Sequence, residues 1–281
     1  MHEFLHCLLH AFLDTLKMLP LLFLAYLLME LLEHKTSSKM EKALEKIGHA
    51  GPLAGSLLGC VPQCGFSATS ANLYSSGLIT EGTLIAVFLA TSDEAVVLLL
   101  SSLDSVSSVW KLIVTKIIIG VIIGFSIDFI YKLLKIKKQP VDMCKDCGCD
   151  EEKTIWLPAL KHTLKVSLFI FIVSLVLGYS IELLGEERIS SLLLSDSFFQ
   201  PFITALFGLI PSCAVSAAIT ELYTAGALSF GSAVAGLCSG AGVGLAVLLK
   251  TNPVKRENLR IIGILYFVAV ASGILLNLLN I

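Results

Sequence analysis

The sequence predicts an all-α polytopic membrane protein with about 10 transmembrane or re-entrant helices in two inverted five-helix repeats. Hydrophobic residues make up 56% of the 281 positions and charged residues 15%, whereas soluble domains carry about 25% charged residues. Apolar stretches recur along the chain, and one block of sequence returns 149 positions later. Composition, apolar stretches and repeat together predict this fold class.

Six stretches approach the length of about 20 apolar residues that a membrane-spanning helix needs. They lie near 11–33, 80–102, 109–134, 164–184, 228–249 and 260–280. His2, Glu3 and His6 stand where a signal peptide has basic residues, and no small-residue cleavage site follows. We therefore expect the first stretch to be a helix of the protein.

The repeat aligns GCVPQCGFSATSANLYSSGLITEGTLIA, which starts at Gly59, with GLIPSCAVSAAITELYTAGALSFGSAVA, which starts at Gly208. Of the 42 pairs between 59–100 and 208–249, 12 are identical without a gap, an ordered set that biased composition does not easily produce. The predicted organisation is a first membrane repeat over 1–138, a cytoplasmic Cys/acid-rich linker over 139–155 and a second membrane repeat over 156–281.

Basic residues in short loops set the orientation, because such loops stay on the cytoplasmic side. The basic loops lie at 35–46, 135–138 and 250–260. Placing all three inside requires short passes or re-entrant hairpins at 50–61 with 64–77 and at 196–211 with 213–226. Each half then has five segments, so the repeats are inverted and both termini lie outside. If each pair is one long span, the repeat is parallel instead.

Interrupted apolar segments at matching places in two halves are the best sequence indication of a transporter's midplane site. Pro62 and Pro211 lack a backbone N–H and are expected to break a helix just before Cys64 and Cys213. A thiol at a helix start favours its thiolate form, so the two cysteines are candidate ligands for a soft metal or metalloid. The alternative is that they are small residues in tight helix packing.

Two acids lie inside the apolar run LATSDEAVVLLL, where carboxylates are costly enough to mark a functional site. Adjacent side chains cannot face one partner, so we expect Asp93, beside Ser92, to face a cavity as cation ligand or proton carrier, and Glu94 to pair elsewhere. A buried ion pair, or a shorter helix with both acids near water, is the alternative. Lys116 is long enough to snorkel to the interface and is assigned no role.

Other candidates share repeat positions with these residues. The hydroxyls of Ser67 and Ser216 are expected to support the two cysteines. The segment SGAGVG, which begins at Ser239, matches the place of the acids and can bring backbone close to a ligand. Asn72 and Glu221 occupy matching positions as gate residues or second ligands, or as polar residues near a helix end in water.

The linker carries Cys144, Cys147 and Cys149 beside acidic residues. Three thiols without a fourth ligand make a weak, exchangeable site for a soft metal, and a plain linker is the alternative.

The two Pro-x-Cys repeats, CVPQCGFSATSANLYSSGLITEG with ATSDEA and GLIPSCAVSAAITELYTAGALSFG with SGAGVG, resemble the ten-helix heavy-metal exporters. That family is also labelled as manganese transporters and is distantly similar to arsenic permeases. The resemblance implies a secondary transporter in a bacterial inner membrane, which exports a heavy-metal ion or metalloid by alternating access with proton or ion coupling. Its expected partners are membrane lipids and the transported metal or metalloid, with no tightly bound cofactor.

Enzyme activity is not expected, and no GxxxxGK[ST] motif for ATP is present. The net charge of −2 disfavours a nucleic-acid surface, and homo-oligomerisation is left open. Two other functions remain as alternatives: an intramembrane thiol redox enzyme that uses Cys60 and Cys64, and a membrane-anchored metal sensor built on the linker cysteines.

Overall fold

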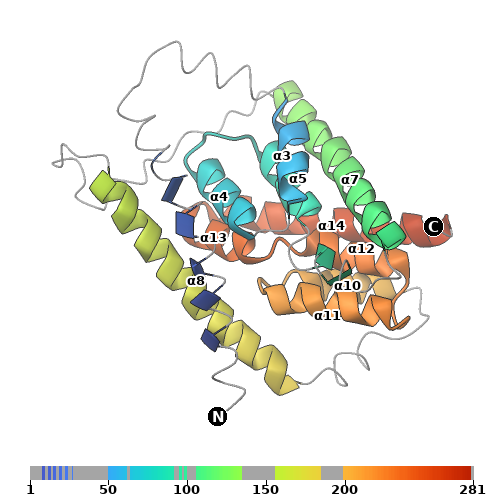
Figure 1. The fold of residues 1–281 in the computed structure, drawn as a ribbon. Coiled ribbons are helices and arrows are strands. Elements are labelled where there is room, and N and C mark those ends of the chain that lie inside the picture. Colours follow the sequence, from blue (N-terminus) through green and yellow to red (C-terminus); the bar gives the residue numbers. More distant parts are fainter. Residues whose placement is uncertain are drawn as a thin grey trace.

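Every element in the described part of the computed structural model is an α-helix, which confirms the predicted all-α class (Figure 1). At Cys64, at 106–108, at 213–214 and in parts of 157–184 the backbone is described but the side chain is not. The described residues are scattered positions between 8 and 27, then 50–61, 64–91, 95–96, 98–99, 106–134, 156–184 and 199–279.

Three consecutive helices recur 149 positions later with the same boundaries. The first set is α3 (Gly51–Gly59), α4 (Cys64–Ser75) and α5 (Glu81–Ala90), and the second is α10 (Gln200–Gly208), α11 (Cys213–Thr224) and α12 (Phe230–Ser239). The other helices are α7 (Val106–Leu133), α8 (Trp156–Leu184), α13 (Val243–Thr251) and α14 (Lys255–Leu278). The repeat in the sequence is thus also a repeat of helix boundaries.

Local sequence explains why matching helices start at matching places. The side chains of Thr80 and Ser229 cap α5 and α12, and each accepts a hydrogen bond from the backbone N–H three residues later. The preceding turns contain Gly77 and Gly226, whose φ angles of 77° and 76° favour glycine. The same turn and cap therefore begin the third helix of each set.

In the first set, α3 and α5 lie side by side and run in the same direction. A Cβ atom added at Gly51 would lie 2.2 Å from the Thr83 hydroxyl oxygen, and one at Gly59 would lie 2.6 Å from the Val87 carbonyl oxygen. Because α4 leads directly into the start of α5, it must return to the end from which α3 began. Helices α3 and α4 therefore form a hairpin that enters and leaves on one side.

The second set repeats this arrangement. The Gln200 side chain at the start of α10 donates to the Ala227 carbonyl oxygen at 3.0 Å and accepts from the Ser229 backbone N–H at 3.2 Å, just before α12. A Cβ atom at Gly208, the end of α10, would lie 2.0 Å from the Gly236 carbonyl oxygen. Helices α10 and α11 thus form a second hairpin, so the contacts disagree with one long span through both helices.

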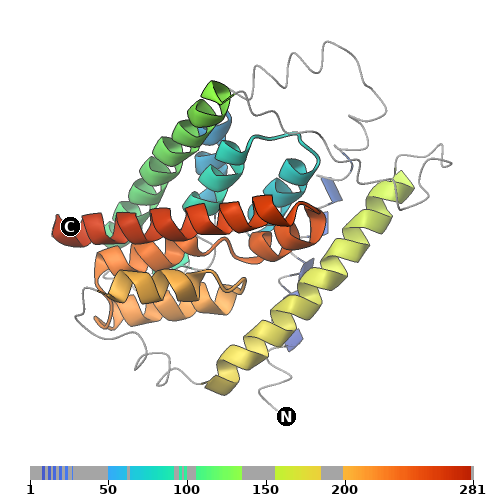
Figure 2. The ribbon, with the colours of Figure 1, turned by 180° about the vertical axis from the view of Figure 1, so that it is seen from behind.

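Helix α14 crosses the bundle and contacts both α5 and α12 (Figure 2). Near its start, Arg260 pairs with Glu81, the first residue of α5. Near its end, Asn277 lies beside Gly231 in the first turn of α12, where an added Cβ atom would be 2.3 Å from the Asn277 Oδ1 atom. Helices α5 and α12 therefore begin at opposite ends of α14 and lead toward its middle.

Three helical segments of the described part are long and apolar enough to span a membrane: Val109–Leu133, Phe230–Thr251 and Lys255–Leu278. The most apolar window of Phe230–Thr251 is 94% buried, against 22% and 33% for the other two. The outer helices expose large apolar side chains such as Trp110 and Phe267. Surfaces of this kind indicate a lipid environment, which agrees with a multi-pass membrane protein.

Helix α8 contains the apolar stretch near 164–184 and is longer than it. It begins at Trp156. Its first turn contains Pro158, which is tolerated there because the first N–H groups of a helix have no intrahelical partner. The helix therefore extends beyond the apolar stretch into the polar sequence after the linker.

The glycines between paired helices give a first testable prediction. Gly208→Ala places a Cβ atom 2.0 Å from one backbone oxygen and 2.2 Å from the Ser239 hydroxyl oxygen, and we expect it to lower the free energy of unfolding by about 1–3 kcal/mol through overpacking. Gly263→Ala in α14 is the matched control, because nothing lies within 4 Å of its added Cβ atom. Thermal unfolding in detergent measures both; equal losses would contradict the packing described here.

Candidate functional site

Each hairpin tip lies where the sequence predicts a helix break. Helix α10 ends at Gly208, Pro211 follows, and α11 begins at Cys213 with Ser212 in extended conformation as its N-cap (φ −140°, ψ 134°). Helix α4 likewise begins at Cys64. Pro62 and the side chains of both cysteines lie outside the described residues. The predicted helix starts at Cys64 and Cys213 are therefore confirmed, and their role as ligands stays a prediction.

A third break interrupts the most buried span. The sequence predicts one continuous helix over 228–249, but α12 ends at Ser239 and α13 begins at Val243. Between them Gly242 has φ 52°, which side chains other than glycine rarely adopt. Ser239 is fully buried and its hydroxyl donates to the Gly236 carbonyl oxygen at 2.9 Å. The SGAGVG segment thus interrupts the span instead of continuing it.

The starts of α4 and α11, at the tips of the two hairpins, lie against this third break. A Cβ atom added at Gly244 would lie 2.7 Å from the Ser67 Cβ atom in the first turns of α4. A Cβ atom at Gly240 would lie 3.6 Å from the Ser216 Oγ atom at the matching place of α11. Both serines are buried. The structure therefore brings Ser67, Ser216 and Ser239 to one region, which we name the junction: 64–67, 213–216 and 239–244.

Helix ends at the junction carry partial charges that a transported solute can use. Helices α4, α11 and α13 all begin there, and helix N-termini present free N–H groups and positive dipole ends. Helix α12 ends there and presents carbonyl oxygens. Serine hydroxyls act as donor or acceptor. The described part of the junction therefore presents neutral hydrogen-bonding groups and helix-end partial charges.

Lys116, to which the sequence assigns no role, does not snorkel to the interface. Its side chain is fully buried in α7. The ammonium group donates to the Leu237 carbonyl oxygen at 2.8 Å and to the carbonyl oxygen of Thr91, the C-cap of α5. A charged group stays in an apolar interior only where such bonds replace water. Lys116 therefore lies at the ends of α5 and α12, next to the junction.

Helix α5 ends shortly before the acidic pair in the sequence. Helix α5 ends at Ala90 and Thr91 is its C-cap, so the helix predicted over 80–102 is interrupted after Ala90. The Thr91 hydroxyl donates to the Val87 carbonyl oxygen at 2.7 Å, the same oxygen that accepts from the Thr91 backbone N–H at 2.9 Å. Ser92, Asp93 and Glu94 lie outside the described residues. Their predicted role is thus untested, although the chain that carries them leaves α5 at the carbonyl bound by Lys116.

Asn72 and Glu221 do not join the junction. Asn72 is fully buried in the last two turns of α4. Glu221 is exposed near the end of α11, about 12 Å along the helix from Cys213 at 1.5 Å per residue. Of the two readings left open for Glu221, the exposed position near a helix end fits the structure.

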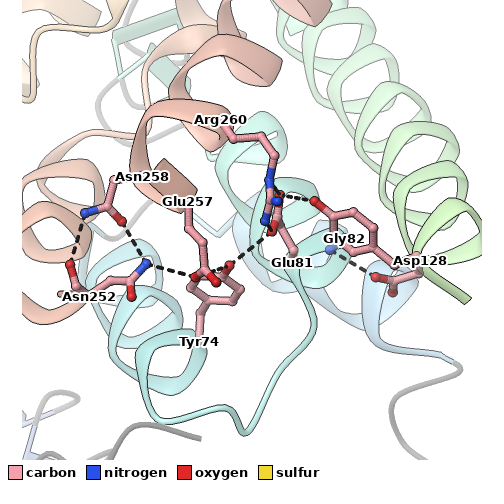
Figure 3. A network of polar contacts seen from close by, with 9 residues as sticks. Tyr74, Glu81, Gly82, Asp128, Asn252, Glu257, Asn258 and Arg260 are labelled. Atoms are coloured by element: carbon pink, nitrogen blue, oxygen red, sulfur yellow. Dashed lines mark hydrogen bonds and ion pairs between the residues drawn. The ribbon is translucent and has the colours of Figure 1, made fainter. Parts of the chain in front are cut away.

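A polar network that the sequence did not predict joins α5 to α14 (Figure 3). The Glu81 carboxylate is 4% exposed. It accepts hydrogen bonds from the Tyr74 and Tyr131 hydroxyls at 3.1 and 2.8 Å. Arg260 adds two bonds, from Nε at 3.0 Å and from Nη2 at 2.5 Å. The network links the first helix set to α14, the last helix of the described part.

Neighbouring polar residues extend the network on both sides (Figure 3). The Tyr74 hydroxyl also lies 3.2 Å from Glu257 Oε2, and the Asn252 amide reaches the same oxygen at 3.3 Å. On the far side of Glu81, the backbone N–H of Gly82 donates to Asp128 Oδ1 at 3.0 Å, which places an anion at the start of α5. The sequence offered one signal, a glutamate and an arginine at the ends of apolar helices.

The described cysteines and potential metal ligands do not form a metal site within the described part of the chain. Cys60 is half-buried and its thiol donates to the Leu57 carbonyl oxygen at 2.9 Å, while Cys238 is fully buried and close enough to Lys116 to interact electrostatically with it. Among the described residues, no group of three or more His, Cys, Asp or Glu side chains could hold a metal ion. Cys144, Cys147 and Cys149 lie outside that part of the chain, so a linker site stays a prediction.

Comparison with known proteins identifies the family. No curated protein and no solved structure matches the chain significantly. A family profile matches residues 2–180 and again 159–280, and thus covers nearly the whole chain in two overlapping segments. The transport-type architecture of broken apolar helices agrees with this match. The chain belongs to the family described as "Putative, 10TM heavy-metal exporter".

Proposed function

We propose that the chain is a secondary transporter that exports a heavy-metal ion or a metalloid by alternating access, coupled to protons or another ion. The observation that carries this proposal is the junction. There the tips of the two hairpins, at Ser67 and Ser216, meet the broken span α12–α13. Transporters bind substrate near the bilayer midplane where helices are interrupted, because irregular backbone there can contact the solute.

The two helix sets are proposed to be inverted repeats. Their support is that α5 and α12 begin at opposite ends of α14, beside Arg260 and Asn277, and that each follows a hairpin that enters and leaves on one side. Rocking of such halves about a shared site opens it to one face at a time. The basic start of α14 and the positive-inside rule favour a cytoplasmic position for the Glu81 network, with both termini outside a bacterial inner membrane.

The proposed substrate contacts combine described and undescribed residues. Ser67 and Ser216 lie at the junction, and Cys64 and Cys213 begin the same helices, so soft ligands and hydroxyls would face one solute. Asp93, or else Glu94, is proposed to exchange the cation for a proton. The linker cysteines are proposed to deliver metal weakly to the transporter.

Flux into sealed proteoliposomes tests the proposal with manganese, zinc, arsenite and an organoarsenical. We expect at least one of them to be transported. The double variant Cys64→Ser/Cys213→Ser is expected to reduce the flux of a soft metal or metalloid by about tenfold or more. Asp93→Asn is expected to reduce the flux of manganese to the same extent. The reason is that loss of even an outer-shell partner costs about 10–100-fold in metal affinity.

Matched controls separate ligand loss from general damage. Cys60→Ser removes a half-buried thiol at the other end of the first hairpin tip, and Glu221→Gln removes an exposed carboxylate; both should keep flux within about twofold. Absence of flux for all four solutes would overturn the transport proposal. If Cys60→Ser is the single variant that loses function, the thiol redox alternative is favoured instead.

A further inference from the structure

The carbonyl ends of two interrupted helices meet at Lys116. Helix α5 ends at Ala90 and the carbonyl oxygen of its C-cap, Thr91, accepts from the ammonium group. In α12, the Leu237 carbonyl oxygen lies in the last turn and accepts from the same group at 2.8 Å. These two helices hold matching positions in the 149-residue repeat, yet a single side chain from α7 contacts both ends.

Helix C-termini attract cations. Their last four carbonyl groups lack intrahelical partners, and the macrodipole places about half a negative charge there. In transporters with broken helices, this is where unwound carbonyl groups and half-helix ends coordinate a monovalent cation. Two such ends pointing at one buried place would be unfavourable without a positive charge between them.

We propose that the Lys116 ammonium group is a built-in substitute for an inorganic monovalent cation at the meeting point of α5 and α12. It neutralises both helix ends and fixes their distance without recruiting an ion from solution. Lys116 is therefore a positioning residue for the junction. As a consequence that rests on the proposed transport function, coupling requires no sodium or potassium ion at this place.

The repeat provides an internal control. The position equivalent to Lys116 in α14 is Leu265, which is also fully buried. A leucine fills the same relative place without charge. Truncation of Leu265 removes packing alone, whereas truncation of Lys116 removes packing and a cation, so the two variants distinguish the roles.

Thermal unfolding of the purified chain in detergent tests the proposal, in choline chloride against sodium, potassium and lithium chloride at equal ionic strength. Wild type should unfold at the same temperature in all four salts. Lys116→Ala should be destabilised in choline and regain at least about 5 °C in one of the alkali-metal salts, in a saturable manner, because an ion that binds only the folded state stabilises it by mass action.

The controls keep each outcome decisive. Leu265→Ala should be destabilised equally in every salt, and Lys116→Arg should show no dependence on the alkali-metal ion. Lys116→Met retains the stem's packing and serves the same test where the alanine variant does not fold. The proposal is overturned if the unfolding temperature of Lys116→Ala or Lys116→Met falls and no alkali-metal ion restores it. It is also overturned if the unfolding temperature of wild type depends on the ion to the same extent. Because unfolding is measured without substrate, failure of flux in proteoliposomes would remove the proposed function and leave this result standing.

Discussion

Arg260→Ala should lower the free energy of unfolding by about 3 kcal/mol, because it leaves a buried carboxylate without its cation. Glu81 is 4% exposed, and two of its four hydrogen bonds come from Arg260. The reciprocal change Glu81→Gln should cost less, about 1–2 kcal/mol. The reason is that the Arg260 side chain is 42% exposed and water can solvate its charge once the partner is gone.

Thermal and denaturant unfolding in detergent measure this asymmetry. Adding Glu81→Gln to Arg260→Ala should recover about half of the loss, since a neutral amide replaces the unpaired charge. Arg256→Ala is the matched control: it removes the same charge from an exposed position one turn earlier and should change stability by about 0.5 kcal/mol or less. A double variant that loses the sum of both single losses would show that the two residues do not act as a pair.

Much of the fold was predictable because the repeat is written in residues that decide helix boundaries. Gly77 and Gly226 provide the left-handed turns, and Thr80 and Ser229 provide the caps. Such signals act over a few residues and are visible in a sequence. The break at Gly242 was less visible, because an apolar run with small residues suits a continuous helix equally well.

The candidate site was predictable only in part, since its members come from distant segments. The prolines and cysteines predicted where α4 and α11 begin, and the glycines of 239–244 predicted a close backbone approach. No local signal places Lys116 against Leu237, which is 121 positions away, or Arg260 against Glu81, which is 179 positions away. Lysine in an apolar helix is usually assigned to the interface, and only tertiary packing shows which carbonyl groups replace water.

The junction itself leads to the prediction with the largest effect on transport. Gly244→Ala places a Cβ atom 2.7, 2.8 and 2.9 Å from the Cβ, C and O atoms of Ser67. Two of these are backbone atoms, so relief requires α4 and α13 to separate. We expect the proteoliposome flux to fall by about tenfold or more, because a displacement of about 1 Å at a binding geometry costs roughly a hundredfold in rate.

Gly240→Ala tests whether this effect belongs to the contact with Ser67 or to any substitution in the break. Its added Cβ atom would meet the nearest atom, the Gly236 carbonyl oxygen, at 3.3 Å, and the Ser216 Oγ atom at 3.6 Å. Its φ of −74° suits alanine. We therefore expect flux within about threefold of wild type. If both variants lose flux equally, flexibility of the glycine-rich segment controls transport, and the close approach of α13 to α4 does not. If Gly244→Ala alone loses it, the first turns of α4 form part of the path along which the solute is bound.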